Sequence, residues 1–137
     1  MKYIFYALYM IVQCTWGIGQ TLIGLVLFFK NLKCPHSFYR GCIATEWDRP
    51  NSGISLGLFI FVPKSDDSMV KVHEYGHTYQ SLVLGPLYLI PGMISIIWAN
   101  LPYYRRLRRE KNVPYTRCFV EKNASRIGER ITGEKAV

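Results

Sequence analysis

The chain has 137 residues, of which half are apolar and only 19% are charged. These values exclude a multidomain protein and a disordered one, and they favour a protein that places one or two segments in a membrane. The net charge of +8 suits contact with anionic lipid or the positive-inside rule.

The first predicted element is a membrane-spanning helix. The run from Ile4 to Phe29 carries no charge and is long enough to cross a bilayer as one helix. A secretory signal is the alternative, but the run is too long for one and no small-x-small cleavage site follows it. We therefore predict a retained transmembrane anchor over residues 1–33 and a membrane-associated domain over residues 34–137.

One face of this predicted helix carries small and amide side chains. Four residues recur at spacings of four, three and four: Gln13, Gly17, Gln20 and Gly24. Such a stripe lets another helix approach closely and hydrogen-bond within lipid. We expect this face to pack against a protein helix, although glycine is also simply common in membrane helices.

A β-hairpin is predicted after a polar hinge at residues 30–38. Tyr39–Glu46 and Ile54–Val62 read as two strands on either side of the turn-rich segment 48–53. With a period of two, one face of the second strand carries five apolar residues: Ile54, Leu56, Leu58, Ile60 and Val62. Pro63 ends this strand.

A helix over Met69–Leu84 is predicted next, and Gly85-Pro86 ends it. Four residues before it offer N-cap side chains: Ser65, Asp66, Asp67 and Ser68. The following apolar segment, within residues 82–100, is interrupted again at Pro91-Gly92. We predict a broken helical hairpin that enters and leaves the membrane on one face. A basic tail follows and contains a C-terminal helix.

The motif that carries chemistry is HEYGH, at residues 73–77. Residues four apart share one face of a helix, so His73 and His77 point at one spot, where both can bind zinc. Glu74 is rotated by about 100° from His73, so its carboxylate can take a proton from water without occupying the metal. The alternatives are a metal that is only structural and a polar helix whose histidines hydrogen-bond in a core.

This motif is the zincin signature, and EKNAS at residues 121–125 resembles the E-x-x-A-[SD] segment of gluzincin-like zinc metallopeptidases. The resemblance implies that His73, His77 and Glu121 are the zinc ligands and that Glu74 is the general base. Ser125 departs from the pattern, because many members carry there an aspartate that supports a histidine.

The predicted hairpin gains a role under this resemblance. In gluzincin-like enzymes an edge strand near the metal pairs with extended substrate backbone. The candidate substrate-binding residues are therefore Ile54, Leu56 and Leu58. Alternatively, the strands only cover the motif helix. Four tyrosines are candidates for stabilising an oxyanion: Tyr39, Tyr103, Tyr104 and Tyr115.

The side of the membrane on which the motif lies follows from charge. If Leu82–Ala99 crossed as a straight helix, His77 and Glu121 would lie on opposite sides. With one crossing at Ile4–Phe29, every Lys and Arg except Lys2 lies on one side, which the positive-inside rule makes cytoplasmic. The four cysteines show no paired spacing, as expected of free thiols in that compartment. One crossing is our prediction, and two crossings with the motif outside are the alternative.

Basic residues directly follow the second apolar segment: Arg105, Arg106, Arg108, Arg109 and Lys111. Such clusters contact anionic headgroups, at about 1 kcal/mol for each basic residue near the surface. No groove-reading motif or stacking platform accompanies them. We therefore expect membrane lipid, and no nucleic acid, as a partner.

The predicted fold is α+β, mainly α, and membrane-anchored. It has a transmembrane helix, a β-hairpin, the HExxH helix, a broken apolar helical hairpin and a C-terminal helix bearing Glu121. The run from His73 to Tyr88 is similar to one in small uncharacterised bacterial membrane proteins, and this resemblance implies membrane residence. Together with the distribution of Lys and Arg, it predicts a location in the bacterial inner membrane with the metal motif on the cytoplasmic face. The predicted function is zinc-dependent hydrolysis of peptide bonds in a membrane-proximal polypeptide. The alternative is a non-catalytic integral membrane protein with a structural metal site or a scaffolding role.

Overall fold

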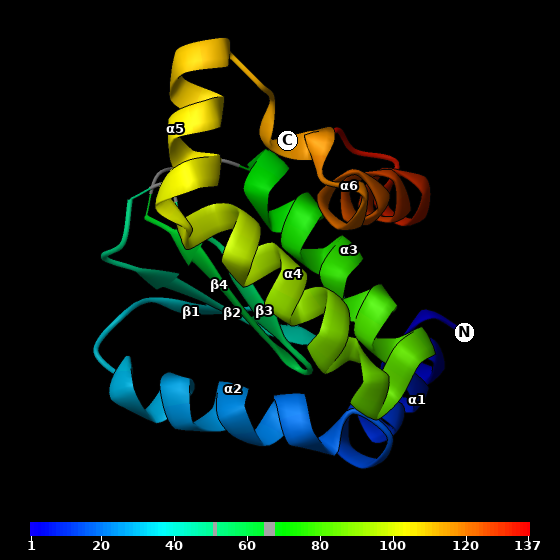
Figure 1. Ribbon diagram of the computed structural model, residues 1–137. Coiled ribbons are helices and arrows are strands. Elements are labelled where there is room, and N and C mark those ends of the chain that lie inside the picture. Colours follow the sequence, from blue (N-terminus) through cyan, green and yellow to red (C-terminus); the bar gives the residue numbers. More distant parts are fainter. Residues whose placement is uncertain (51, 65–67) are drawn as a thin grey trace.

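The computed structural model describes residues 1–50, 52–64 and 68–137. Their elements, in chain order, are α1 (Lys2–Thr15), α2 (Ile18–Lys30), β1 (His36–Tyr39), β2 (Cys42–Trp47), β3 (Ile54–Leu56), β4 (Phe59–Pro63), α3 (Ser68–Leu84), the 3-10 helix η1 (Gly85–Tyr88), α4 (Leu89–Asn100), α5 (Pro102–Lys111), the 3-10 helix η2 (Tyr115–Arg117) and α6 (Phe119–Thr132). The fold is α+β and mainly helical, as the sequence predicts (Figure 1). Four residues on which the predictions rest lie outside the described ranges: Asn51 of the turn-rich segment 48–53 and the N-cap candidates Ser65, Asp66 and Asp67.

A four-stranded sheet with the order β1-β2-β4-β3 lies at the centre of the fold. β1–β2 and β3–β4 are antiparallel pairs, and β2 runs parallel to β4. The predicted hairpin of Tyr39–Glu46 with Ile54–Val62 is wrong. A turn at Gly41, which has a φ of +97°, divides the first predicted strand between β1 and β2, and Gly57, which has a φ of +61°, turns the chain back between β3 and β4. Two hairpins result, and they meet through the parallel pair β2–β4. A Cβ at Gly57 would also lie 2.2 Å from Thr21 Oγ1, so both backbone and space favour glycine. This turn leaves β3 at the edge of the sheet.

Helices cover both faces of the sheet. α2 and α3 each contact β3 and β4, and Figure 1 shows them on opposite sides of the strands. All five residues of β4 are buried, so the alternation expected of a half-exposed strand does not apply there. The core around the sheet is rich in aromatic residues and includes Tyr9, Trp47, Phe59, Phe61 and Tyr75.

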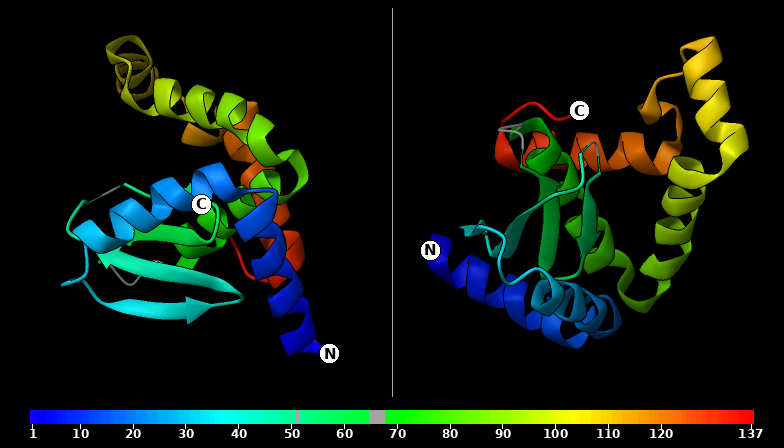
Figure 2. Two further views of the ribbon diagram at one scale, coloured as in Figure 1. Left: turned by 90° about the horizontal axis from the view of Figure 1, so that it is seen from below. Right: turned by 90° about the vertical axis from the view of Figure 1, so that its left-hand side faces the viewer.

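The N-terminal apolar segment forms two helices rather than the one predicted over Ile4–Phe29. α1 and α2 meet at 96° (Figure 2). At the bend, the N–H of Gly17 donates to the carbonyl of Val12, at 3.2 Å. The hydroxyl of Thr21 donates to the carbonyl of Gln13, at 2.8 Å. The bend is therefore hydrogen-bonded, and residues 1–30 contain no straight transmembrane helix.

The stripe of amide and small residues on α1 and α2 faces the interior of the same chain. Gln13 and Gln20 are 0% and 1% exposed. Gln13 Nε2 donates to the carbonyl of Thr78, at 2.9 Å, and Gln20 Nε2 donates to the carbonyl of Gly85, at 2.6 Å. Gly24 lies against the backbone of β3. The predicted close-packing face thus lies against α3, its C-terminal end and β3.

The motif helix α3 follows the prediction closely and ends at Leu84. Gly85 has a φ of +53°, and a Cβ there would lie 2.2 Å from the ring of Trp16. After η1, α4 turns back instead of continuing in line with α3 (Figures 1 and 2). Pro91 does not break α4, because it lies in the first turn, where its missing N–H is not needed. The predicted broken apolar hairpin therefore has one break instead of two.

Exposed apolar side chains cover the outer faces of α1, α2 and α4: Ile4, Phe5, Leu8, Ile11, Leu22, Ile23, Val26, Phe29, Leu89, Ile90, Met93, Ile96 and Ile97. By length and composition, the helical stretch Ser68–Asn100 is apolar enough to cross a membrane. Only 17% of the most apolar 18 residues of this stretch is buried, so their apolar surface does not serve the protein's own core. α1 and α2 are long and apolar enough to cross a membrane only if the bent pair is counted as one span.

Candidate metal centre

The candidate centre forms where α3 and α6 lie in close contact. Each helix carries a glycine at this contact. A Cβ on Gly76 would lie 1.9 Å from the carbonyl oxygen of Ala124, and one on Gly128 would lie 2.2 Å from that of Val72. The buried face of α6 also includes Glu121, which therefore faces α3.

Three side chains meet between these helices. His73 Nε2 lies 3.0 Å from Glu121 Oε2, and His77 Nε2 lies 3.2 Å from the same oxygen. All three residues are buried, and their ligand atoms lie within 4.8 Å of one another. This group could hold a metal ion. The structure thus brings together the two motif histidines and the glutamate that the resemblance selected.

Nδ1 of His77 has a hydrogen-bond partner that determines which ring nitrogen carries the proton. Gln80 Nε2 donates to the carbonyl of Val120 and to Asn123 Oδ1, both at 3.0 Å. These bonds set the orientation of the amide, so that Gln80 Oε1 faces His77 Nδ1 at 2.8 Å. A carbonyl oxygen only accepts, so His77 Nδ1 carries the proton. Sequence analysis missed Gln80, although a polar residue three positions after His77 was a readable signal.

Ser125 accepts the corresponding hydrogen bond from His73. Its hydroxyl donates to the backbone oxygen of Val137, at 2.9 Å, and therefore accepts from His73 Nδ1–H, at 2.8 Å. A serine thus occupies the supporting position in which the gluzincin pattern often has an aspartate. The departure at Ser125 leaves His73 supported by a neutral acceptor.

Both rings consequently aim Nε2 at the Glu121 carboxylate. With Nδ1 protonated, a neutral imidazole presents an Nε2 lone pair, so three electron-pair donors face one buried point. Such donors repel one another unless a proton or a cation lies between them. Glu121 Oε1 is also buried and has no hydrogen-bond partner among the residues that the structure describes. This donor set fits a divalent metal ion.

Glu121 supplies the charged ligand of this donor set. Burial alone raises the pKa of the Glu121 carboxyl, but hydrogen bonds from His73 and His77 outweigh it and lower the pKa below its usual value. Glu121 therefore stays ionised near neutral pH. Because the Glu121 carboxylate is already ionised, it can bind a metal ion without first releasing a proton.

Glu74 lies beside these donors without joining them. Its carboxylate packs against Gly53, where a Cβ would lie 2.2 Å from Oε1. Glu74 is 5% exposed and lines the same cavity as His77 and Glu121. The loop before β3 therefore holds the carboxylate at the wall of the cavity.

The cavity has a volume of about 910 Å³ and lies between α2, β3, α3 and α4. Two of the candidate substrate-binding residues, Ile54 and Leu56, line it. The third, Leu58, packs in the hydrophobic core instead, because the turn at Gly57 takes it away from the sheet edge. All three residues of β3 thus line the cavity.

Tyrosines also reach the cavity. Of the four oxyanion candidates, Tyr115 lines it, and burial raises the pKa of this phenol, so its hydroxyl stays protonated. Tyr103 is exposed, while Tyr39 and Tyr104 pack against other aromatic rings. Tyr88 of η1, which sequence analysis did not single out, is buried and lines the cavity.

Comparisons of the chain with protein-family models, with curated proteins and with solved structures gave no match. The gluzincin resemblance therefore stays a prediction. The function of the site is inferred from the side chains and the cavity described above.

Proposed function

We propose that the protein is a zinc metallopeptidase that hydrolyses peptide bonds in membrane-proximal polypeptides. The observation that carries this proposal is the convergence of His73, His77 and Glu121, with both Nδ1 protons committed to other partners. Two imidazole nitrogens and one carboxylate oxygen are a ligand set of catalytic zinc, which keeps a fourth position open.

The residues of the cavity supply the remaining chemistry. When bound, zinc acts as a Lewis acid that polarises a carbonyl group and makes water more acidic. Glu74, one position after His73 on α3, takes a proton from the attacking water and delivers it to the leaving amine. Tyr88 and Tyr115 line the same cavity, and their hydroxyls would donate hydrogen bonds to the developing oxyanion.

An extended polypeptide suits the cavity, because β3 is an edge strand. β3 pairs with β4 on one side, and its residues Ile54–Leu56 line the cavity. A substrate strand that pairs with this edge forms hydrogen bonds with the backbone N–H and C=O groups of β3. Alternate side chains of the substrate then point into the cavity. This arrangement brings the scissile carbonyl toward the metal ligands.

We place the outer faces of α1, α2 and α4 in the bacterial inner membrane, with the metal centre toward the cytoplasm. No charged residue lies between Lys2 and Lys30, and Glu74 is the only one between Lys71 and Arg105. The basic helix α5 follows α4 directly and suits anionic headgroups at the membrane surface.

Metal analysis of detergent-purified protein tests this function. We expect about one zinc per chain in the wild type and in Glu74→Gln, and almost none in His73→Ala, His77→Ala or Glu121→Gln, since three-ligand zinc sites rarely survive loss of a ligand. Cleavage of a detergent-solubilised membrane polypeptide mixture, read by mass spectrometry, should occur with the wild type and not with Glu74→Gln. Equal peptide patterns for the two zinc-loaded proteins would leave a structural metal site as the conclusion.

A further inference from the structure

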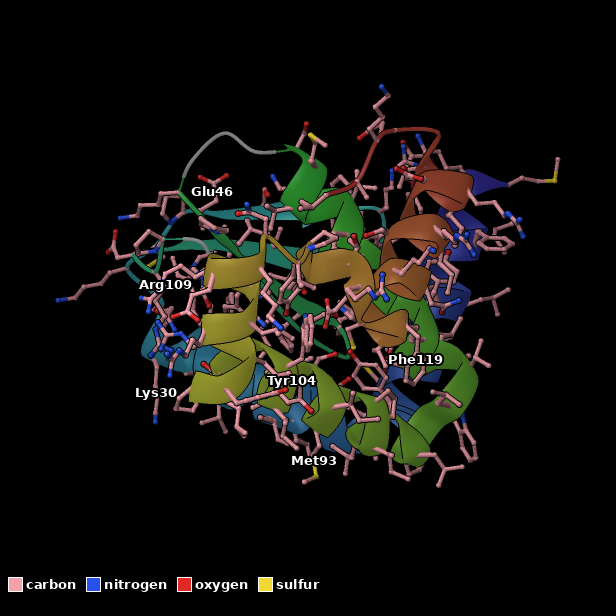
Figure 3. All side chains as sticks on the ribbon, turned by 45° about the horizontal axis from the view of Figure 1, so that its top comes forward. Lys30, Glu46, Met93, Tyr104, Arg109 and Phe119 are labelled. Carbon is pink, nitrogen blue, oxygen red and sulfur yellow. The ribbon has the colours of Figure 1, made fainter. Side chains whose placement is uncertain are left out.

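One part of the cavity wall is continuous with the apolar outer surface. Its lining includes Ile23 and Leu27 of α2 and Met93 and Ile96 of α4. Ile23 and Met93 are also 49% and 62% exposed on the outside of the molecule, and Figure 3 shows Met93 pointing outward from α4. The cavity therefore opens between α2 and α4, onto the surface that the proposed function places in lipid.

Another part of the wall is positively charged. Arg49, in the segment between β2 and β3, and Arg105, at the start of α5, both line the cavity and are exposed. The guanidinium of Arg49 lies 4.9 Å from the ring centre of Trp47. Among the described residues, neither arginine lies within ion-pair distance of a carboxylate. This pair of cations is therefore available to an anionic group inside the opening.

We propose that the cavity takes an extended segment of a membrane polypeptide, which enters between α2 and α4 and places an acidic flanking residue at Arg49 and Arg105. This inference rests on the proposed function, because it names the class of polypeptide that the site receives. The apolar side chains of the segment lie against Ile23 and Met93, and its backbone pairs with β3.

A phospholipid also combines apolar chains with an anionic group. It has no row of amide groups to pair with the β3 edge, however, and it would leave that edge without a partner. The combination of an edge strand, an apolar opening and two arginines without a carboxylate partner among the described residues therefore favours a polypeptide.

Peptide binding to zinc-loaded Glu74→Gln protein in detergent micelles tests the charge recognition without hydrolysis. The probe is a fluorescein-labelled peptide with a leucine and valine run followed by two glutamates, and its matched control ends in two glutamines. Arg49→Gln and Arg105→Gln should each weaken binding of the glutamate peptide about three- to fivefold and leave the glutamine peptide unchanged. Arg109→Gln, on the same basic helix but outside the cavity lining, should change neither. Equal wild-type affinity for the two peptides would overturn the charge recognition.

The lateral opening is tested in the same assay. Ile23→Trp and Met93→Trp should narrow it and weaken both peptides at least about fivefold, a change of about 1 kcal/mol. Val26→Trp, on the exposed face of α2 outside the cavity lining, should not. Equal effects of Ile23→Trp and Val26→Trp would overturn the proposed entry. Displacement of the peptide by phosphatidylglycerol at similar concentration would assign the cavity to lipid and overturn the proposal.

These outcomes are separable from those of the proposed function. Intact, arginine-dependent binding without cleavage by the wild type would contradict the hydrolase and leave the recognition in place. Cleavage whose rate does not depend on the acidic residues of the substrate or on the Ile23→Trp and Met93→Trp substitutions would contradict the proposed recognition and leave the proposed hydrolase in place.

Discussion

Replacing Gly76 by alanine tests whether the close contact of α3 and α6 assembles the metal centre. The new Cβ would lie 1.9 Å from the carbonyl oxygen of Ala124, whereas real Cβ contacts essentially never fall below 3.0 Å. The helices must therefore separate by about 1 Å, which moves the motif histidines away from Glu121. Overpacking of this kind costs about 1–3 kcal/mol, and metal-ligand distances tolerate only about 0.2 Å. We expect lower stability and a zinc affinity reduced at least about tenfold.

Thermal unfolding in detergent and competition with a zinc chelator measure the two effects. The matched control is Gly19→Ala on α2, because nothing lies within 4 Å of a Cβ at that glycine. It should keep the wild-type zinc affinity and leave the stability unchanged or raise it by up to about 1 kcal/mol. If Gly76→Ala behaved like Gly19→Ala in both measurements, the contact between the helices would not set the ligand geometry.

The structure also predicts the zinc affinity of two variants and the alkylation of two cysteines. Gln80→Leu removes the acceptor of His77 Nδ1–H and should lower zinc affinity about 10- to 100-fold in chelator competition. Ser125→Ala removes the acceptor of His73 Nδ1–H and should lower the zinc affinity to a similar degree. An unchanged zinc affinity in both variants would contradict the inference that these hydrogen bonds fix the protons on Nδ1 of the two histidines. Burial raises the pKa of the Cys42 thiol to about 12, so at about pH 9 it should resist alkylation while exposed Cys14 reacts. Mass spectrometry should find Cys42 labelled only after unfolding, and native labelling would contradict its place in the core.

The parts of the fold that local sequence determines could be predicted. The motif helix was predicted within a residue of its observed start, and the C-terminal helix bearing Glu121 was expected. The histidine pair could be read because residues four apart on a helix share a face whatever surrounds it. The place of Glu121 beside them came from the gluzincin resemblance alone, since it depends on how α6 packs.

The features that depend on distant partners could not be predicted. The bend between α1 and α2 depends on the hydroxyl of Thr21, which accepts from the N–H of Leu58 and donates to the carbonyl of Gln13. The turn that divides the predicted second strand depends on the positive φ of Gly57, which composition does not reveal. The amide of Gln80 gains its role only through contacts with α6.

The bend between α1 and α2 has a practical consequence for anyone who prepares the protein. Gln13 and Gln20 donate to the backbone of Thr78 and Gly85, so the first thirty or so residues are a structural support for the motif helix α3 and the turn that follows it. Cutting them away to obtain a soluble fragment would strip one face of the sheet and leave the carbonyls of Thr78 and Gly85 without these donors. Such a fragment should aggregate, and the purification must keep the entire chain in detergent or lipid.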